Sequence, residues 1–464
     1  MKKYISFGKF NAYYKFIISS VVFKLVYNIL FGVQIGYSTQ LLRLLPENDL
    51  VDHSLIHDLF NYLGILIISL ILFLCDKIYY KKNAKEPEVK SKPRNSLIHN
   101  EVELDIIDGK LCIKLLVITF IWVLMEQSEK IYYYCTLSDL DYWPCEMLIL
   151  AYFCKKMFGN KLYKHQKFSI LFILIVGSLL KLGSFIISLY IDDQDILFIQ
   201  KKYWIPLGII FFLIIIFFRS YVSCKLKWVM DYKYIFIIKL MILYGFSGVI
   251  INSLICLIST YSECHSDKCA VKSSDGSERH YESFLIYFEK MRNITANEKF
   301  IEILYIILAS LINFFVVLNH LLIIKYLSPI HTICSGAIYY ILIQIILIIV
   351  NKIKNNNFFK GEENQEDKAA KYIFDISGDF FSAFSTTIFL ELIEFNFCGC
   401  NYNLRKNIIE RSKLEGNNAY DIESFESIES GALFNDNRSS VKSSISSRQM
   451  SKNTELSVIP EHKY

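Results

Sequence analysis

The chain has 464 residues, of which 53% are hydrophobic, with a mean hydropathy of +0.34 and a formal net charge of +5. It contains only 7 prolines and 18 glycines, fewer than a globular chain of this length usually carries. A water-soluble chain of 464 residues would form two or three domains. The hydropathy argues against that organisation and favours a protein of the lipid bilayer.

Ten stretches of the chain are predicted to cross the membrane, since a helix needs about 20 mostly apolar residues to do so. The five strongest are residues 56–75, 203–219, 234–260, 300–324 and 330–350. Five weaker stretches fill the gaps between them: residues 14–37, 111–125, 142–157, 168–190 and 380–397. Together they predict an all-α polytopic membrane protein with about ten transmembrane helices.

The first of these stretches, residues 14–37, has an alternative interpretation. It carries Lys15, Lys24 and Asn28 within its apolar sequence. A helix of this kind can lie in the plane of the membrane surface instead of crossing it.

Lysine and arginine orient the predicted helices, because short cytoplasmic loops carry an excess of both. Segments 77–94, 155–167 and 219–233 are rich in these residues, and segments 40–55 and 127–141 are poor in them. Both termini are therefore expected in the cytoplasm, although lysines in the outer segment 351–371 count against this arrangement. The predicted organisation is a cytoplasmic N-terminus (1–13), a first group of helices (14–190, with the cytoplasmic loop 81–108), a second group (203–397, with the outer loop 261–299) and a tail (398–464).

The outer loop 261–299 carries two features typical of an extracytoplasmic segment. Asn293 begins the sequon Asn-Ile-Thr, so it is a candidate for glycosylation. Cys264 and Cys269 lie close together and are candidates for a disulfide in an oxidising compartment. The alternative is that both patterns arise by chance.

The tail 398–464 is polar and ends in a serine-rich stretch with interspersed basic residues. A disordered cytoplasmic segment is the interpretation that its composition favours. Phosphorylation of the serines is the alternative functional interpretation.

The ten stretches divide into two groups of five on either side of the loop 191–202. Because five is odd, the second group would be inverted relative to the first. Inverted repeats recur in secondary transporters, where the substrate binds at the repeat interface near the middle of the membrane.

Two short junctions resemble those of a known family. Residues 156–168, Lys-Met-Phe-Gly-Asn-Lys-Leu-Tyr-Lys-His-Gln-Lys-Phe, resemble the basic turn between the fourth and fifth helices of the drug/metabolite transporter superfamily, which includes nucleotide-sugar transporters. Residues 326–332, Tyr-Leu-Ser-Pro-Ile-His-Thr, resemble its Ser-Pro junction between the eighth and ninth helices. The resemblance implies ten helices over residues 14–397 and transport of a small metabolite. The stretch 330–350 lacks the lysine that sugar-phosphate members carry there, and the helices are poorer in glycine and alanine than those of the family.

Charged residues inside apolar stretches need an explanation, because each costs at least about 2.5–3.5 kcal/mol at the centre of a bilayer. Lys181 lies about 21 Å of helix rise beyond the cytoplasmic end of its stretch and has small neighbours, which suggests a cation facing an anionic substrate. Lys24 is a second candidate for that role. For both lysines the alternative is that the ammonium group reaches out to the membrane surface.

Three further polar residues complete the predicted substrate site. Glu146 is expected near the outer end of its helix, where with Glu126 it would form a gate or lie in solvent. Asn313 is near the middle of the stretch 300–324, and His320 is closer to its inner end. The alternative for these two residues is an ordinary hydrogen bond between helices.

Enzyme motifs such as His-Glu-x-x-His, Gly-x-Ser-x-Gly and the P-loop do not occur in the sequence. We therefore predict a transporter of a small polar or anionic metabolite, with no cofactor and no nucleic-acid partner, in an endomembrane or the plasma membrane of a eukaryote. An intramembrane acyltransferase that uses His320 as general base, and a receptor or scaffold without transport, are the alternatives. The oligomeric state is left open.

Overall fold

The structure is a computed structural model, and almost all of the residues that it describes are helical. It describes residues 5–7, 15–31, 54–83, 109–136, 143–159, 162–180, 183, 205–233, 235–262, 271–272, 279–280, 282–354, 365–395 and 407. The helices are α1 (Lys15–Phe31), α2 (Ser54–Asn83), α4 (Gly109–Thr136), α5 (Trp143–Phe158), α6 (Lys164–Phe172) with the π-helical turn η3 (Ile173–Gly177), α9 (Ile205–Tyr232), α10 (Ile237–Tyr261), α11 (Phe284–Asn293), α12 (Ala296–Tyr326), α13 (Pro329–Lys354) and α14 (Gln365–Phe389). The strands are β1 (Ile5–Phe7), β2 (Val271–Lys272), β3 (Arg279–His280) and β4 (Ile393–Phe395).

Three of the described helices are long and apolar enough to cross a membrane: Leu55–Ile78 in α2, Ile237–Tyr261 in α10 and Ala296–Tyr326 in α12. Pro329–Ile343 in α13 is a shorter apolar helix. The prediction of a helical chain with apolar helices long enough to cross a membrane is confirmed at this level. The number of ten spans stays a prediction.

Each of the ten predicted stretches overlaps a helix, but the bounds differ, and at two stretches the difference changes the interpretation. The stretch 203–219 belongs to α9, which has 28 residues in total and ends at Tyr232. Arg219 therefore lies midway along a helix and not at its inner end. The stretch 380–397 is wrong as a single span, because α14 covers Gln365–Phe389 and the chain then forms β4. Apolarity alone did not distinguish the end of α14 from the strand that follows it.

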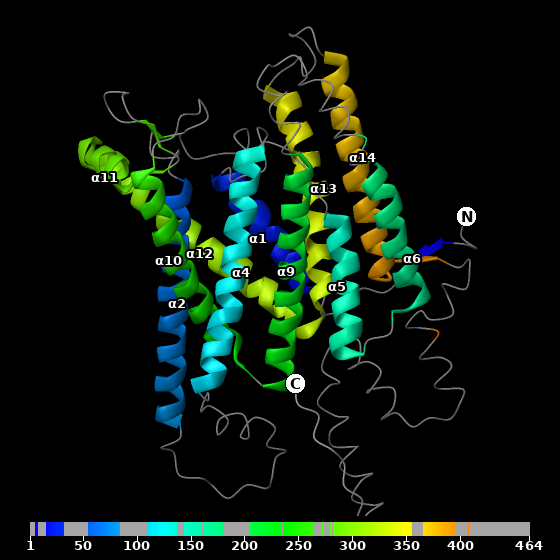
Figure 1. The fold of residues 1–464 in the computed structure, drawn as a ribbon, viewed down its shortest axis with the longest axis horizontal. Coiled ribbons are helices and arrows are strands. Elements are labelled where there is room, and N and C mark those ends of the chain that lie inside the picture. Colours follow the sequence, from blue (N-terminus) through cyan, green and yellow to red (C-terminus); the bar gives the residue numbers. More distant parts are fainter. Residues whose placement is uncertain are drawn as a thin grey trace, which may run out of the picture. The chain divides into compact units, whose positions relative to one another are not determined.

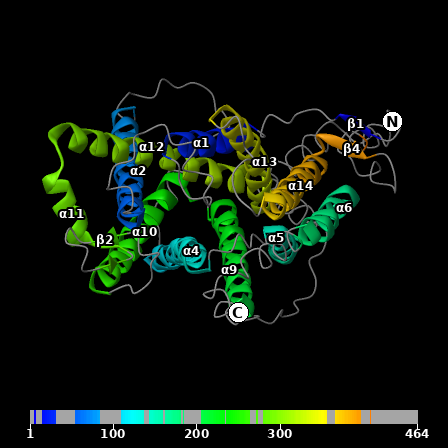
Figure 2. The same ribbon diagram turned by 90° about the horizontal axis from the view of Figure 1, so that it is seen from above.

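The loop 261–299 also contains more regular structure than its polar composition suggests. Strands β2 and β3 pair as an antiparallel ladder, and α11 follows them before α12 begins at Ala296. These elements lie beside the end of α10, where α11 runs across the direction of that helix (Figures 1 and 2).

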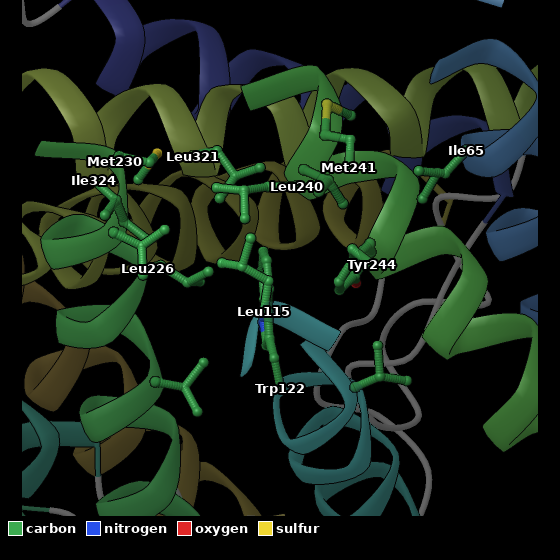
Figure 3. Packing of buried hydrophobic residues seen from close by; sticks show 14 of the residues in the cluster. Ile65, Leu115, Trp122, Leu226, Met230, Leu240, Met241, Tyr244, Leu321 and Ile324 are labelled. Carbon is green, nitrogen blue, oxygen red and sulfur yellow. The ribbon is translucent and has the colours of Figure 1, made fainter. Parts of the chain in front are cut away.

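The main hydrophobic core lies among α2, α4, α9, α10 and α12 (Figure 3). Trp122, Leu226, Tyr244 and Leu321 are each buried within it. Helix α12 has 31 residues and is therefore about 46 Å long, longer than the roughly 30 Å of a bilayer's hydrocarbon. Such a helix fits the bilayer by tilting, and α12 runs obliquely to α2 and α10 (Figures 1 and 2).

Two glycines bring α10 and α2 close together. A Cβ atom added at Gly245 would lie 2.8 Å from the backbone nitrogen of Leu66, and one added at Gly248 would overlap the ring of Tyr62. Gly245 faces Leu66 and Gly248 faces Tyr62, so residue numbers increase in opposite directions along the contact and the two helices are antiparallel. Small residues allow this approach of one backbone to another in membrane helices.

Helix α1 packs along α12 and α13, within the helical bundle. The rings of Phe16 and Tyr326 stack at 5.4 Å between centroids, and those of Phe23 and Phe315 at 5.0 Å. These pairs make α1 antiparallel to α12. The packing favours a bundle helix over the alternative of a helix that lies on the membrane surface.

The two ends of the helical region meet in a small sheet. Strand β1, near the N-terminus, pairs antiparallel with β4, which follows the last helix (Figure 2). Nearby, the Ser169 hydroxyl of α6 donates to the Ser385 carbonyl of α14 at 2.7 Å. Residues 5–7 and 393–395 therefore lie on the same side of the bundle.

Lys227 belongs to the basic segment 219–233, which was expected in the cytoplasm, but its side chain is buried in the bundle. It is 2% exposed, and its ammonium donates to the carbonyls of Ile324 at 3.2 Å and Lys325 at 3.0 Å. Asp231 lies 3.2 Å from the same nitrogen. Lys227 therefore binds carbonyl groups at the C-terminus of α12, where a cation is electrostatically favoured.

We expect Gly245→Ala to destabilise the protein by about 1–3 kcal/mol, because its Cβ would press on the backbone of Leu66. Gly336→Ala on α13 is the matched control, since nothing lies within 4 Å of its added Cβ. The control should gain up to about 1 kcal/mol from helix propensity. Thermal unfolding of the detergent-solubilised protein measures both, and equal midpoints would contradict the close packing of α2 and α10.

Candidate functional site

Arg219, midway along α9, binds two carboxylates inside the helical bundle. Its Nε donates to Oε1 of Glu146 at 2.8 Å, and a second guanidinium nitrogen donates to the other oxygen of the same carboxylate. Its Nη1 donates to Oε2 of Glu129 at 2.5 Å. The guanidinium therefore bridges α5 and α4, with a two-pronged contact to α5 that suits the planar geometry of both groups.

The positions of the two glutamates have local explanations. Glu146 lies in the first turn of α5, where the partial positive charge of a helix N-terminus favours a carboxylate. Glu129 lies in α4, which packs along α9. Their side chains are 10% and 21% exposed, and that of Arg219 is 23% exposed. The prediction that Glu146 lies in solvent is therefore wrong, because the guanidinium holds it inside.

Lys24 of α1 and His320 of α12 add two basic groups to this site. Lys24 lies within electrostatic range of Arg219 and Glu146, and His320 within range of Lys24 and Arg219. We call Lys24, Glu129, Glu146, Arg219 and His320 the central polar cluster. Its members come from five helices, α1, α4, α5, α9 and α12.

Polar groups around the central cluster differ in whether they have partners. Within the described part of the chain, no hydrogen bond or ion pair engages the side chains of Lys24, His320 or Asn313. All three are partly exposed. Asn313 lies two helical turns before His320, so both face the same side of α12. These groups are available to bind a polar ligand.

A second polar layer lies beside the central cluster. Oε2 of Glu126 accepts hydrogen bonds from the hydroxyls of Tyr62 at 3.1 Å and Tyr244 at 2.6 Å. The ring of Trp122 lies 4.4 Å from that of Tyr244 and 5.5 Å from that of His320, measured between centroids. Trp122 therefore contacts both Tyr244, which belongs to the Glu126 network, and the imidazole of His320. Figure 3 shows Trp122 and Tyr244 in the core.

The structure brings together three of the five predicted substrate-site residues: Lys24, Glu146 and His320. Asn313 is near them on α12, and Lys181 lies outside the described residues. His320 makes a ring contact instead of the hydrogen bond between helices that was the alternative for it.

Sequence reasoning missed Arg219, which is the centre of the cluster. It was assigned to the inner end of a span, because the ten apolar residues before it were long enough to suggest that the span ended there. The uninterrupted helical sequence to Tyr232, without proline or glycine after Arg219, was the signal that could have placed it inside.

The predicted glycosylation site lies at the junction of α11 and α12. Asn293 is exposed at the end of α11. Thr295 is the N-cap of α12: its hydroxyl donates to Oε2 of Glu298 at 2.9 Å and accepts from the Glu298 backbone nitrogen at 3.4 Å. A capping box thus explains Thr295 without glycosylation. Cys264 and Cys269 lie outside the described residues.

The chemistry available at the central polar cluster is the binding of charged groups. Among the described residues, no group of three or more His, Cys, Asp or Glu side chains could hold a metal ion. The ion-paired guanidinium of Arg219 and the unpartnered ammonium of Lys24 supply positive charge. The carboxylates of Glu146 and Glu129 supply the balancing negative charge. An anion that enters would bind Lys24 and compete with Glu146 or Glu129 for Arg219.

Comparison with protein-family models gives no match, and comparison with curated proteins gives no significant match. The resemblance to the drug/metabolite transporter superfamily therefore stays a prediction that rests on the two short junctions.

We expect Arg219→Met to destabilise the protein by about 3 kcal/mol, because it leaves two partly buried carboxylates without their counter-charge. Arg292→Met, at an exposed position on α11, is the matched control and should change little. Adding Glu129→Gln and Glu146→Gln to Arg219→Met should recover much of the loss, since no uncompensated charge remains. A melting temperature of Arg219→Met equal to that of the control would contradict the ion-paired cluster.

We expect Asn293 to carry an N-linked glycan when the protein is made in eukaryotic cells, if the loop 261–299 is extracytoplasmic as predicted. A glycosidase should then shift the gel mobility of the wild type but not of Asn293→Gln. The tail contains a second sequon, Asn437-Arg438-Ser439, and Asn437→Gln should have no effect because the tail is expected in the cytoplasm. A glycan on Asn437 would reverse the predicted orientation.

Proposed function

We propose that the protein is a multi-pass membrane transporter of a small polar or anionic metabolite that works by alternating access. The observation that carries this proposal is the central polar cluster, with its unpartnered Lys24, in an apolar helical bundle. Charged residues at such positions usually line substrate or ion pathways. The proposal includes ten membrane-spanning helices arranged as two inverted groups of five.

The packing of the helices supports the inverted arrangement. In two groups of five, α1 corresponds to α9, α2 to α10, α4 to α12, α5 to α13 and α6 to α14. Three helices pack on their own counterparts: α2 on α10, α5 on α13 and α6 on α14. Three further contacts are each matched by a second contact when both helices are replaced by their counterparts. The contact α1–α12 is matched by α9–α4, α1–α13 by α9–α5, and α2–α12 by α10–α4. A pseudo-two-fold relation between the groups would produce this pattern.

The relative directions of the helices also agree with ten alternating spans. Helices α1 and α2 are antiparallel to α12 and α10 respectively, as the ring stacks and glycine contacts indicate. Helix α2 is parallel to α12, since His57 pairs with Glu302 and Phe60 with Ser310 further along both helices. Helix α5 is parallel to α9 for the same reason, through Glu146 with Arg219 and Cys154 with Cys224.

The cluster lies where an inverted-repeat transporter binds its substrate, at the interface of the two groups. Its two cations, Lys24 and Arg219, come from α1 and α9, which correspond to one another in the two groups. Arg219 is already paired, so Lys24 is the cation that we expect to make first contact with an anionic group. The β1–β4 pairing supports termini on one side of the membrane, expected to be the cytoplasmic side.

The alternatives receive less support from the same geometry. An acyltransferase would need a nucleophile or activating partner for His320, and no described side chain hydrogen-bonds to its ring. A scaffold without a ligand would not need unpartnered polar groups inside the bundle, because each destabilises the fold unless a ligand satisfies it. A ligand-binding receptor could use the same groups, and uptake is the property that separates it from a transporter.

Uptake into proteoliposomes tests the proposal, with radiolabelled phosphate, succinate, glutamate and uridine monophosphate as probes. We expect uptake of at least one of these anions and a loss of about tenfold or more in Lys24→Gln, because a lost charge-assisted hydrogen bond costs about 1.5–3 kcal/mol. Lys15→Gln, an exposed position on the same helix, is the matched control.

No uptake of any probe by folded protein would contradict an anion transporter. Equal uptake by Lys24→Gln and Lys15→Gln would instead exclude Lys24 from the site.

A further inference from the structure

Helix α11 lies at the level where three apolar helices end. The α2 span begins at Leu55, the α10 span ends at Tyr261 and the α12 span begins at Ala296. Glu282, just before α11, accepts hydrogen bonds from the backbone nitrogens of Leu55 at 3.1 Å and Ile56 at 3.3 Å. The carboxylate thereby binds the N-terminus of α2, and α11 is held beside the boundary of the apolar helices.

The buried face of α11 is anchored by specific contacts. Ser283 is its N-cap and accepts from the Ile286 nitrogen at 3.4 Å. The Phe284 nitrogen donates to Oγ1 of Thr260 at the end of α10, at 3.1 Å. Tyr287 is 1% exposed, and its hydroxyl lies 3.5 Å from Oε1 of Glu302 on α12. Burial, together with the carboxylate of Glu302, raises the pKa of Tyr287, so it remains a neutral hydrogen-bond donor.

This anchoring leaves large apolar side chains on the opposite face. Leu285 is 70% exposed and Phe288 is 59% exposed, one turn apart on α11. Arg292 follows on the same face one turn later and is also exposed. The orientation is fixed by Ile286 and Tyr287 on the buried face, so the apolar residues cannot turn inward without breaking those contacts.

The two membrane-spanning candidates that α11 connects also expose large apolar side chains. Leu257 and Ile258 of α10 are 53% and 64% exposed, and Phe300 and Ile307 of α12 are 66% and 60% exposed. Helix α11 runs across the end of α10 and does not extend it (Figures 1 and 2). A short helix at this level, crosswise to the spans, with Leu285 and Phe288 exposed beside the charged Glu289 and Arg292, has the geometry of an interfacial helix.

We propose that α11 binds the surface of the bilayer, with Leu285 and Phe288 inserted among the lipid chains and Arg292 among the headgroups. The occupant of this face is lipid because α11 is bonded to the end of α10 and leads directly into α12, and both of these helices are candidates to cross the membrane. The helix then joins the outer loop to the membrane at the ends of α2, α10 and α12. The inference rests on the membrane placement of the proposed function but not on transport.

Site-directed fluorescence tests this proposal in the full-length protein, reconstituted in phosphatidylcholine vesicles without any solute. Single cysteines replace Leu285, Phe288 or Arg292 and carry an environment-sensitive fluorophore, with unsubstituted protein measured in parallel to subtract labelling of native thiols. Brominated phosphatidylcholine should quench most of the emission at positions 285 and 288 and much less at 292. Aqueous iodide should show the opposite order.

Two outcomes would overturn the proposal. Strong quenching by iodide at 285 and 288 would mean that the face is in water. Protection from both quenchers would mean that protein covers it, for example a second copy of the chain.

A photoactivatable phosphatidylcholine provides a second measurement that needs no substitution. It should crosslink the unsubstituted protein at the peptide that contains residues 284–292. Absence of that peptide among crosslinks that include α10 and α12 would also overturn the proposal. Because neither measurement uses a solute, failure here is distinguishable from a failure of the transport experiment.

Discussion

The contact of Arg219 with Glu146 and Glu129 is the constraint around which the bundle is organised. A guanidinium inside an apolar bundle is stable only if counter-charges lie within hydrogen-bonding distance. Two carboxylates satisfy it, and they tie α9 to α5 and α4. The three helices must therefore pack so that these side chains meet, which gives the apolar contacts between them a defined register that hydrophobicity alone would not specify.

The same cluster connects architecture with the proposed activity. Arg219 is satisfied by protein groups, whereas the side chains of Lys24, His320 and Asn313 form no hydrogen bond or ion pair with the described residues. In a polar site of this kind, some groups have protein partners without a ligand, and the groups that lack partners are those that a ligand would bind. In the proposed transporter, rocking of the group that contains α9 and α12 against the group that contains α1, α4 and α5 would open or close this site.

The loop 261–299 is organised by a different principle. Its polar residues hold helix ends: Glu282 binds the N-terminus of α2, and Thr295 begins α12. Its apolar residues are divided between a buried face and the free face of α11. The division is consistent with a segment that stabilises the ends of the spans on one side and contacts the membrane surface on the other.

The fold class was predictable from the sequence because apolar stretches of about 20 residues leave few alternatives to membrane helices. Gly245 and Gly248 are small residues at helical spacing, which favours close packing, but only the structure shows that α2 is the helix they contact. The helix ends were less predictable. The apolar residues after Phe389 looked like a continuing span, yet they form a strand because β1 is available to pair with them.

The sequence by itself determined which residues needed an explanation, because Lys24, Glu146 and His320 are costly in apolar surroundings wherever their partners lie. Only the tertiary structure decided that Glu146 pairs with Arg219, whereas Lys24 and His320 form no hydrogen bond or ion pair with the described residues. Glu146 and Glu129 are 73 and 90 residues away from Arg219 along the chain, and no local pattern relates them. Such a contact depends on the packing of α4 and α5 against α9, which is a property of the assembled bundle and not of any one helix.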